Sequence, residues 1–163
     1  MDEAIGNVRQ MSQLLRPTIL DDFGLEAGLR WLAEGFSART GVEVHVDSHY
    51  AGRLADETET HLFRIAQEAL TNVARHSGAK HVRITLGSTG SQIRLSVQDD
   101  GCGLPATAAN SRGLGMIGMR ARARSAGGDV TVRGDKGPGG KGQGVLIEVR
   151  VPLVNETHSH PAG

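Results

Sequence analysis

The fold of this chain is decided by the stretch Phe63-Arg64-Ile65-Ala66-Gln67-Glu68-Ala69-Leu70-Thr71-Asn72-Val73-Ala74-Arg75-His76-Ser77-Gly78-Ala79. It belongs to the strongest amphipathic pattern of the sequence, which predicts a helix over residues 56–76. Apolar residues recur every three to four positions of this helix and form one continuous stripe. They are Leu62, Ile65, Ala66, Ala69, Leu70 and Val73. The core of the domain is therefore expected to pack against this stripe.

Glu68 and Asn72 flank the stripe of the 56–76 helix. Because one helical turn separates them, they lie one above the other and could face a cleft at the edge of the core. A carboxylate can orient or deprotonate a nucleophile, and an amide oxygen is a suitable ligand for Mg²⁺. Taken alone, however, the pair is more typical of a solvated helix flank.

Weaker patterns on both sides of this helix predict an α+β domain. Residues 25–40 form an amphipathic helix, and residues 1–15 form a shorter one that Pro17 ends. A further helix is expected from about residue 114 to residue 125. Alternating apolar residues predict strands at 42–46, 82–86, 93–97, 130–133 and 145–151. Helices on one face of a mixed, mainly antiparallel sheet give a two-layer α/β sandwich, and Trp31 is expected to pack the 25–40 helix onto this sheet.

Two glycine-containing segments follow the central helix. Asp99-Asp100-Gly101-Cys102-Gly103 comes directly after a strand, where a carboxylate can accept a hydrogen bond from an exocyclic amine. Its glycines allow the backbone to approach a flat ring, although Asp-Asp-Gly is also ordinary turn chemistry. Ser111-Arg112-Gly113-Leu114-Gly115-Met116 opens a helix, whose free N–H groups favour phosphate, but it lacks the Gly-Lys-Ser/Thr of a Walker motif. Each segment is a weak signal alone, but the Glu68–Asn72 helix followed by these two segments, in this order, makes three signals that are strong together.

Composition narrows the classes of protein that fit. The chain has 163 residues, which suits one compact domain, and 38% of them are hydrophobic. Lys+Arg and Asp+Glu are both 18, a balance that argues against a nucleic-acid partner. The single cysteine, Cys102, excludes an intrachain disulfide and fits a reducing compartment. Because no apolar run approaches the ~20 residues that span a bilayer, we expect a cytoplasmic location without membrane contact, although a full-length protein could be anchored upstream.

The order of these motifs resembles the ATPase superfamily of gyrase, the heat-shock chaperone, histidine kinases and mismatch-repair proteins, which share the Bergerat ATP-binding fold. The resemblance is closest to sensor histidine kinases that pair with helix-turn-helix response regulators. Residues 63–79 are very similar to their N box, and Gly113-Leu114-Gly115-Met116-Ile117-Gly118-Met119-Arg120 matches their second glycine box. Leu15-Arg16-Pro17-Thr18-Ile19-Leu20-Asp21-Asp22-Phe23-Gly24-Leu25 resembles the joint between their dimerisation helices and ATPase domain. The likeness covers roughly residues 10–153.

The resemblance implies a role for each matching residue. Asn72 would hold Mg²⁺, and Glu68 would be the catalytic residue that orients or activates the incoming histidine or a water. Asp99 would bind the adenine amine. The remaining ATP-binding residues would be Gly101 and Gly103 at the base, Gly113, Leu114, Gly115 and Met116 around the second glycine box, and Arg75 and His76 as phosphate neighbours.

The same resemblance leaves one part of the family pattern without a match. The phospho-accepting histidine of the family lies on a long helix and is followed by an acidic residue. None of the seven histidines of this chain has an acidic residue after it. We therefore expect the phosphoacceptor helix to be missing, with residues 1–24 as the end of a dimerisation helix and its joint. Residues 25–153 would be the ATP-binding catalytic domain and residues 154–163 a disordered tail.

The function implied is transfer of the γ-phosphoryl group of Mg²⁺-bound ATP to a histidine on the missing helix, for relay to a response-regulator aspartate. The implied partners are the protein's own dimerisation and phosphoacceptor domain, in a homodimer, and a response regulator. The fragment alone is not expected to autophosphorylate. Two alternatives on the same fold are a nucleotide-gated protein-binding switch and a serine kinase of the anti-sigma type.

Overall fold

Alternating apolar residues build a five-stranded sheet in this protein. The computed structural model describes residues 17–102, 116–135 and 144–153, so the predicted helix at 1–15 and the predicted tail at 154–163 lie outside the described residues. The sheet order is β1-β2-β3-β5-β4, with β1 parallel to β2 and every other pair antiparallel. The strands are β1 (Glu43–Ser48), β2 (His81–Thr89), β3 (Gln92–Asp99), β4 (Asp129–Asp135) and β5 (Gly144–Pro152).

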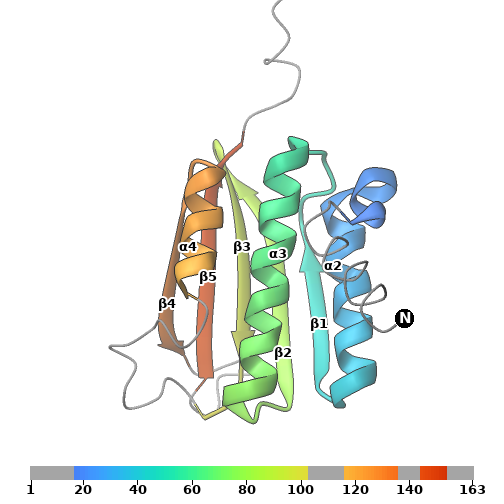
Figure 1. Ribbon diagram of the computed structural model, residues 1–163, viewed down its shortest axis with the longest axis vertical. Helices are drawn as coiled ribbons and strands as arrows, with labels where there is room; N and C mark the ends of the chain where they lie inside the picture. The colour runs from blue at the N-terminus through green and yellow to red at the C-terminus, as the bar shows by residue number, and fades with distance from the viewer. Residues whose placement is uncertain (1–16, 103–115, 136–143, 154–163) are drawn as a thin grey trace, which may run out of the picture.

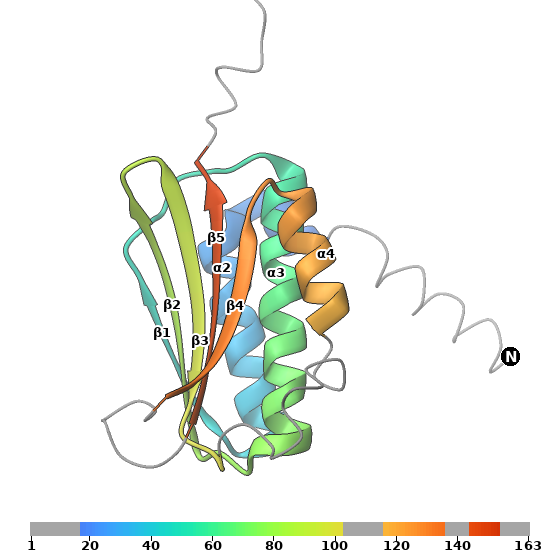
Figure 2. The same ribbon diagram turned by 90° about the vertical axis from the view of Figure 1, so that its left-hand side faces the viewer.

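The helices of the described residues cover one face of this sheet (Figures 1 and 2). They are α2 (Thr18–Thr40), α3 (Asp56–Asn72) and α4 (Met116–Ser125), and α3 continues into a π-helical turn, η1 (Val73–Ser77). This arrangement confirms the predicted α+β, two-layer sandwich with a mixed, mainly antiparallel sheet. No helix in the described ranges combines the length and apolar character that crossing a bilayer requires.

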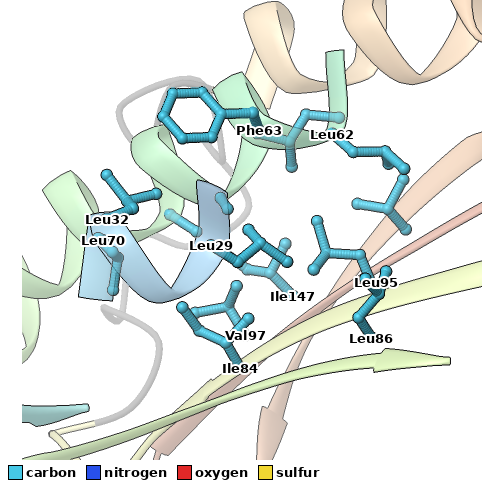
Figure 3. Close-up of a cluster of buried hydrophobic side chains, with 14 of the residues drawn as sticks. Leu29, Leu32, Leu62, Phe63, Leu70, Ile84, Leu86, Leu95, Val97 and Ile147 are labelled. Carbon is cyan, nitrogen blue, oxygen red and sulfur yellow. The ribbon is translucent and has the colours of Figure 1, made fainter. Parts of the chain in front are cut away.

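The hydrophobic core fills the space between the two layers. Figure 3 shows leucines of α2 and α3 meeting aliphatic side chains of β2, β3 and β5. Burial of this apolar surface is the main source of stability, at roughly 25 cal/mol for each Å² removed from water. The labelled members are Leu29, Leu32, Leu62, Phe63, Leu70, Ile84, Leu86, Leu95, Val97 and Ile147.

Helix α2 starts earlier than the sequence predicts and is broken at Gly24. This residue has φ 85° and ψ −174°, a backbone conformation that glycine adopts without strain. The turn before it, which begins at Thr18, folds back so that Leu20 is fully buried. A Cβ at Gly28 would come within 2.7 Å of the Leu20 side chain and 3.4 Å of Phe63. The packed unit therefore extends back at least to Leu20.

The prediction for Trp31 is wrong. Its side chain is 56% exposed and stacks on Phe63 of α3, with ring centroids 6.4 Å apart and an interplanar angle of 24°. Leu29 and Leu32 occupy the buried side of α2 instead, and a helical step of 100° per residue turns position 31 away from them. Trp31 therefore covers the junction between the two helices rather than the sheet.

Candidate functional site

Asn72 and Glu68 lie at the end of the central helix. Asn72 is the last residue of α3 and is only 9% exposed, and Glu68, one turn earlier, is half-buried. The predicted helix over 56–76 departs from α-helical hydrogen bonding after Asn72, where η1 begins. Gly78, with φ 62°, then ends the element. The apolar stripe of α3 packs on the sheet, so Asn72 is held at the edge of the core.

Asp99 ends β3 and is a second polar residue at the core edge. It is 6% exposed, and its Oδ1 accepts a hydrogen bond of 2.9 Å from the N–H of Gly101. Burial raises the pKa of the Asp99 carboxyl, and although the N–H groups of Gly101 and Val145 oppose this shift, the net direction is upward. The Asp99 carboxyl group therefore has a fixed orientation and is shielded from solvent.

The backbone at the start of β5 packs against the backbone of Asp99. Gly144 lies so near β3 that a Cβ atom there would overlap the carbonyl oxygen of Asp99. Only glycine permits this approach without displacing one of the two strands. Sequence patterns alone do not single out Gly144, because the residue lies in a region with many glycines.

The fold brings the ends of these elements together. In Figure 1, the C-terminal end of α3, the end of β3 and the start of β5 all lie at the lower end of the molecule. The first turn of α4 points toward the same end, and its first residue, Met116, is buried in the core. Asn72, the last residue of α3, and Asp99, the last residue of β3, therefore lie toward one end of the two layers, with Gly101 just beyond Asp99. Gly103, Gly113, Leu114 and Gly115 lie outside the described residues.

Arg75 occupies a different surface from Asn72. Together with Trp31, Phe36 and Arg39 it lines a groove of about 270 Å³ between α2 and the end of α3. Among the described residues, neither Asn72 nor Asp99 lines this groove. The side chain of His76 lies outside the described residues, so the predicted phosphate contacts of Arg75 and His76 stay predictions.

The residues present suit a nucleotide that brings its own metal ion. Within the described ranges there is no group of three or more His, Cys, Asp or Glu residues that could hold a metal by itself. Mg²⁺ commonly keeps several waters and binds through one or two protein oxygens plus substrate phosphates. The buried Asn72 amide could supply one such oxygen, and the shielded Asp99 carboxyl fits an amine donor such as that of adenine.

Comparison with known proteins identifies the family. Residues 57–155 match the model of the histidine kinase-, DNA gyrase B- and HSP90-like ATPases. The chain belongs to this family. Within it, the chain is 36% identical over 154 residues to the sensor histidine kinase LiaS of Bacillus subtilis, a match that covers 94% of this chain and 41% of LiaS. The chain spans less than half the length of the curated relatives it matches.

Solved structures share the fold of this chain. A blue-light activated histidine kinase of Erythrobacter litoralis aligns with TM-score 0.67 and 22% identity, covering 82% of this chain and 43% of that one. Full-length ShkA in complex with AMPPNP aligns with TM-score 0.62 and 24% identity, covering 80% of this chain and 30% of that one. The chain therefore has the fold of a histidine kinase catalytic domain.

Proposed function

We propose that this ATPase domain binds ATP with Mg²⁺ and transfers the γ-phosphoryl group to a histidine on a dimerisation helix, from which a response-regulator aspartate receives it. The observation that carries the proposal is that the buried Asp99 carboxyl and the buried Asn72 amide lie at one end of the same two layers. Family membership and the names of the sensor kinase relatives support it.

Each residue at this end has a separate task in the proposal. Asp99 accepts a hydrogen bond from the exocyclic amine of adenine, and Gly101 gives the base room. The Asn72 amide holds Mg²⁺, which when bound neutralises charge that develops on the phosphates. Glu68 orients the incoming histidine or a water. The N–H groups of Gly113, Leu114 and Gly115 bind phosphate ahead of Met116, which anchors the start of α4.

We also propose the partners and the cellular location of this domain. The phosphoacceptor histidine is not one of the seven in this chain and belongs to the protein's own dimerisation domain, which acts in a homodimer. A response regulator is the second partner, and the domain works in the cytoplasm. The formal net charge of zero offers no basic footprint for nucleic acid.

Nucleotide binding provides the first test. Calorimetric titration of the 163-residue chain with Mg²⁺-ATP should show one site. Asp99→Asn should weaken binding about 10- to 100-fold, because a hydrogen bond to a charged group is lost. Asp129→Asn, at an exposed aspartate that begins β4, is the matched control and should bind like the wild type. Equal affinity in all three proteins, or no binding by the wild type, contradicts the proposal.

Phosphoryl transfer provides the second test. The chain is incubated with γ-labelled ATP, alone and with a separately produced dimerisation domain that carries a phosphoacceptor histidine. Acid-labile label should appear only on the dimerisation domain. Stable labelling of the chain itself contradicts the proposal, and acid-stable label on a partner favours a serine kinase.

A further inference from the structure

Asp100, the residue after Asp99, is fixed to the start of β2 by several hydrogen bonds. The Asp100 Oδ1 atom accepts hydrogen bonds of 2.9 Å from the backbone N–H groups of both Lys80 and His81. Its Oδ2 atom lies 2.6 Å from His81 Nδ1. The backbone N–H of Asp100 donates to the carbonyl oxygen of His81 over 3.2 Å. One carboxylate thus binds the start of β2 through three separate groups.

The electrostatics of this contact favour a charged Asp100. Burial alone would raise the pKa of the Asp100 carboxyl, but the N–H groups of His81 and Lys80 and the imidazole of His81 outweigh it and lower the pKa. His81 Nε2 also lies 3.4 Å from Glu43 Oε2 on β1, so the imidazole links strand β1 to the end of β3. Hydrogen bonds to an ionised acceptor are stronger than neutral ones.

The contact between Asp100 and His81 lies at the end of β3, where the pairing of β3 with β2 ends. Val82 and Asp99 are the last paired residues of β2 and β3 on this side. Successive residues of an extended chain point to opposite faces, so Asp99 faces the helix layer while Asp100 faces the other side. Strand ends with few backbone bonds open at low free energy. Asp100 and His81 therefore fix the backbone from which the Asp99 side chain extends.

We propose that Asp100 and His81 are positioning residues that hold Asp99 for recognition of the adenine amine, and that they thereby set the preference for ATP over GTP. The inference rests on the proposed nucleotide site. Guanine presents a carbonyl oxygen where adenine presents its amine, so a fixed carboxylate at Asp99 binds one base and repels the other. A carboxylate free to shift discriminates less, because discrimination depends on polar groups that cannot adapt to the wrong ligand.

The test is the ratio of the GTP and ATP dissociation constants, measured with Mg²⁺ on the full chain. Asp100→Ala removes all three side-chain contacts and should lower this ratio about tenfold. Asp100→Asn keeps an oxygen for the two backbone N–H groups and should retain most of the preference. His81→Gln leaves those two bonds in place and should lower the ratio by a smaller factor. General destabilisation of the protein would weaken the binding of both nucleotides alike and leave the ratio of their dissociation constants unchanged.

A matched control is available on β1. His45 Nε2 lies 3.2 Å from Asp47 Oδ1, which makes a second histidine–aspartate contact, and both of these residues belong to β1. His45→Gln should keep the wild-type ratio. If Asp100→Ala does not fold, as judged by its melting curve, the shift in His81→Gln decides the test. Wild-type ratios in every variant that folds would overturn the inference.

This failure is distinguishable from failure of the proposed function. If the wild type prefers ATP and Asp99→Asn abolishes that preference, the nucleotide site stands whatever Asp100→Ala does. If the wild type binds neither nucleotide, the proposed function fails, and the inference about Asp100 and His81 fails with it.

Discussion

Gly144, the first residue of β5, lies directly against the backbone of Asp99, the last residue of β3. The contact joins the strand that carries the proposed adenine-binding carboxyl to the strand whose Val145 N–H donates to that carboxyl. A side chain at position 144 would separate the two strands at this point.

Gly144→Ala should therefore impair stability and nucleotide binding together. Overpacking of this kind costs about 1–3 kcal/mol, and displacement of β5 removes a hydrogen bond from Asp99. The measurements are chemical denaturation and ATP titration. Gly87→Ala is the control, since nothing lies within 4 Å of a Cβ at that position in β2. A Gly144→Ala protein as stable as Gly87→Ala would show that the approach is looser than described.

Glu68→Gln should separate chemistry from binding. The side chain is half-buried on α3, one turn before Asn72, and the proposal gives it no contact with adenine. Loss of an orienting carboxylate should slow phosphoryl transfer about 10²- to 10⁴-fold while ATP affinity changes little. Glu57→Gln, at an exposed glutamate of the first turn of α3, should transfer at the wild-type rate. Unchanged transfer in Glu68→Gln would favour the nucleotide-gated switch.

The buried carboxylate of Glu59 should make Arg53 important for stability. Glu59 is 0% exposed, and its Oε2 lies 3.1 Å from Arg53 Nε, while Arg53 Nη2 donates to the carbonyl oxygen of Leu20 over 2.9 Å. Arg53→Met deprives a fully buried charge of its cationic partner, which costs about 3 kcal/mol.

The free energy of unfolding, measured with denaturant, should also be compared in two further variants. Arg53→Met combined with Glu59→Met should be more stable than Arg53→Met alone, because no buried charge is then left behind. Arg83→Met removes a partly exposed ion pair, in which Arg83 Nη1 lies 3.5 Å from Asp47 Oδ2, and should change stability by less than about 1 kcal/mol. Equal losses in Arg53→Met and Arg83→Met would contradict the importance of burial.

His61 should make stability fall in mild acid. Burial lowers its pKa from 6.5, the positive charge of Arg122 on α4 lowers it further, and Glu57 opposes the shift. Its Nδ1 atom is buried and finds no hydrogen-bond partner among the described residues. The unfolded chain therefore binds a proton that the folded chain resists, so stability is lost as the pH falls below about 6.5.

The variant His61→Gln tests this directly. Between pH 7.5 and pH 5.5 the melting temperature of His61→Gln should fall less than that of the wild type. Arg122→Gln should also flatten the dependence, because it removes one cause of the lowered pKa. Parallel melting curves for the wild type and His61→Gln would contradict the prediction.

Long patterns in the sequence were sufficient for the fold. Each helix or strand places a side chain against the core at a fixed period. Burial can therefore be read from the apolar stripe between Leu62 and Val73 and from the alternating apolar residues of β2, β3 and β5. Trp31 shows the limit of this reasoning. A large apolar residue one step off the stripe of α2 can stack on a neighbouring helix, and only the position of Phe63 decides that it does.

What the sequence alone determined was the set of elements, the family resemblance and the polar residues Glu68, Asn72 and Asp99, since these lie in motifs that are contiguous along the chain. The tertiary structure decided which strand ends meet. Gly144 touches Asp99 across 45 positions of sequence, and Asp100 meets His81 from the next strand, because strand pairing brings them to one end of the sheet. Such contacts depend on register and twist, which are properties of the whole sheet and leave no periodic signal in any one segment.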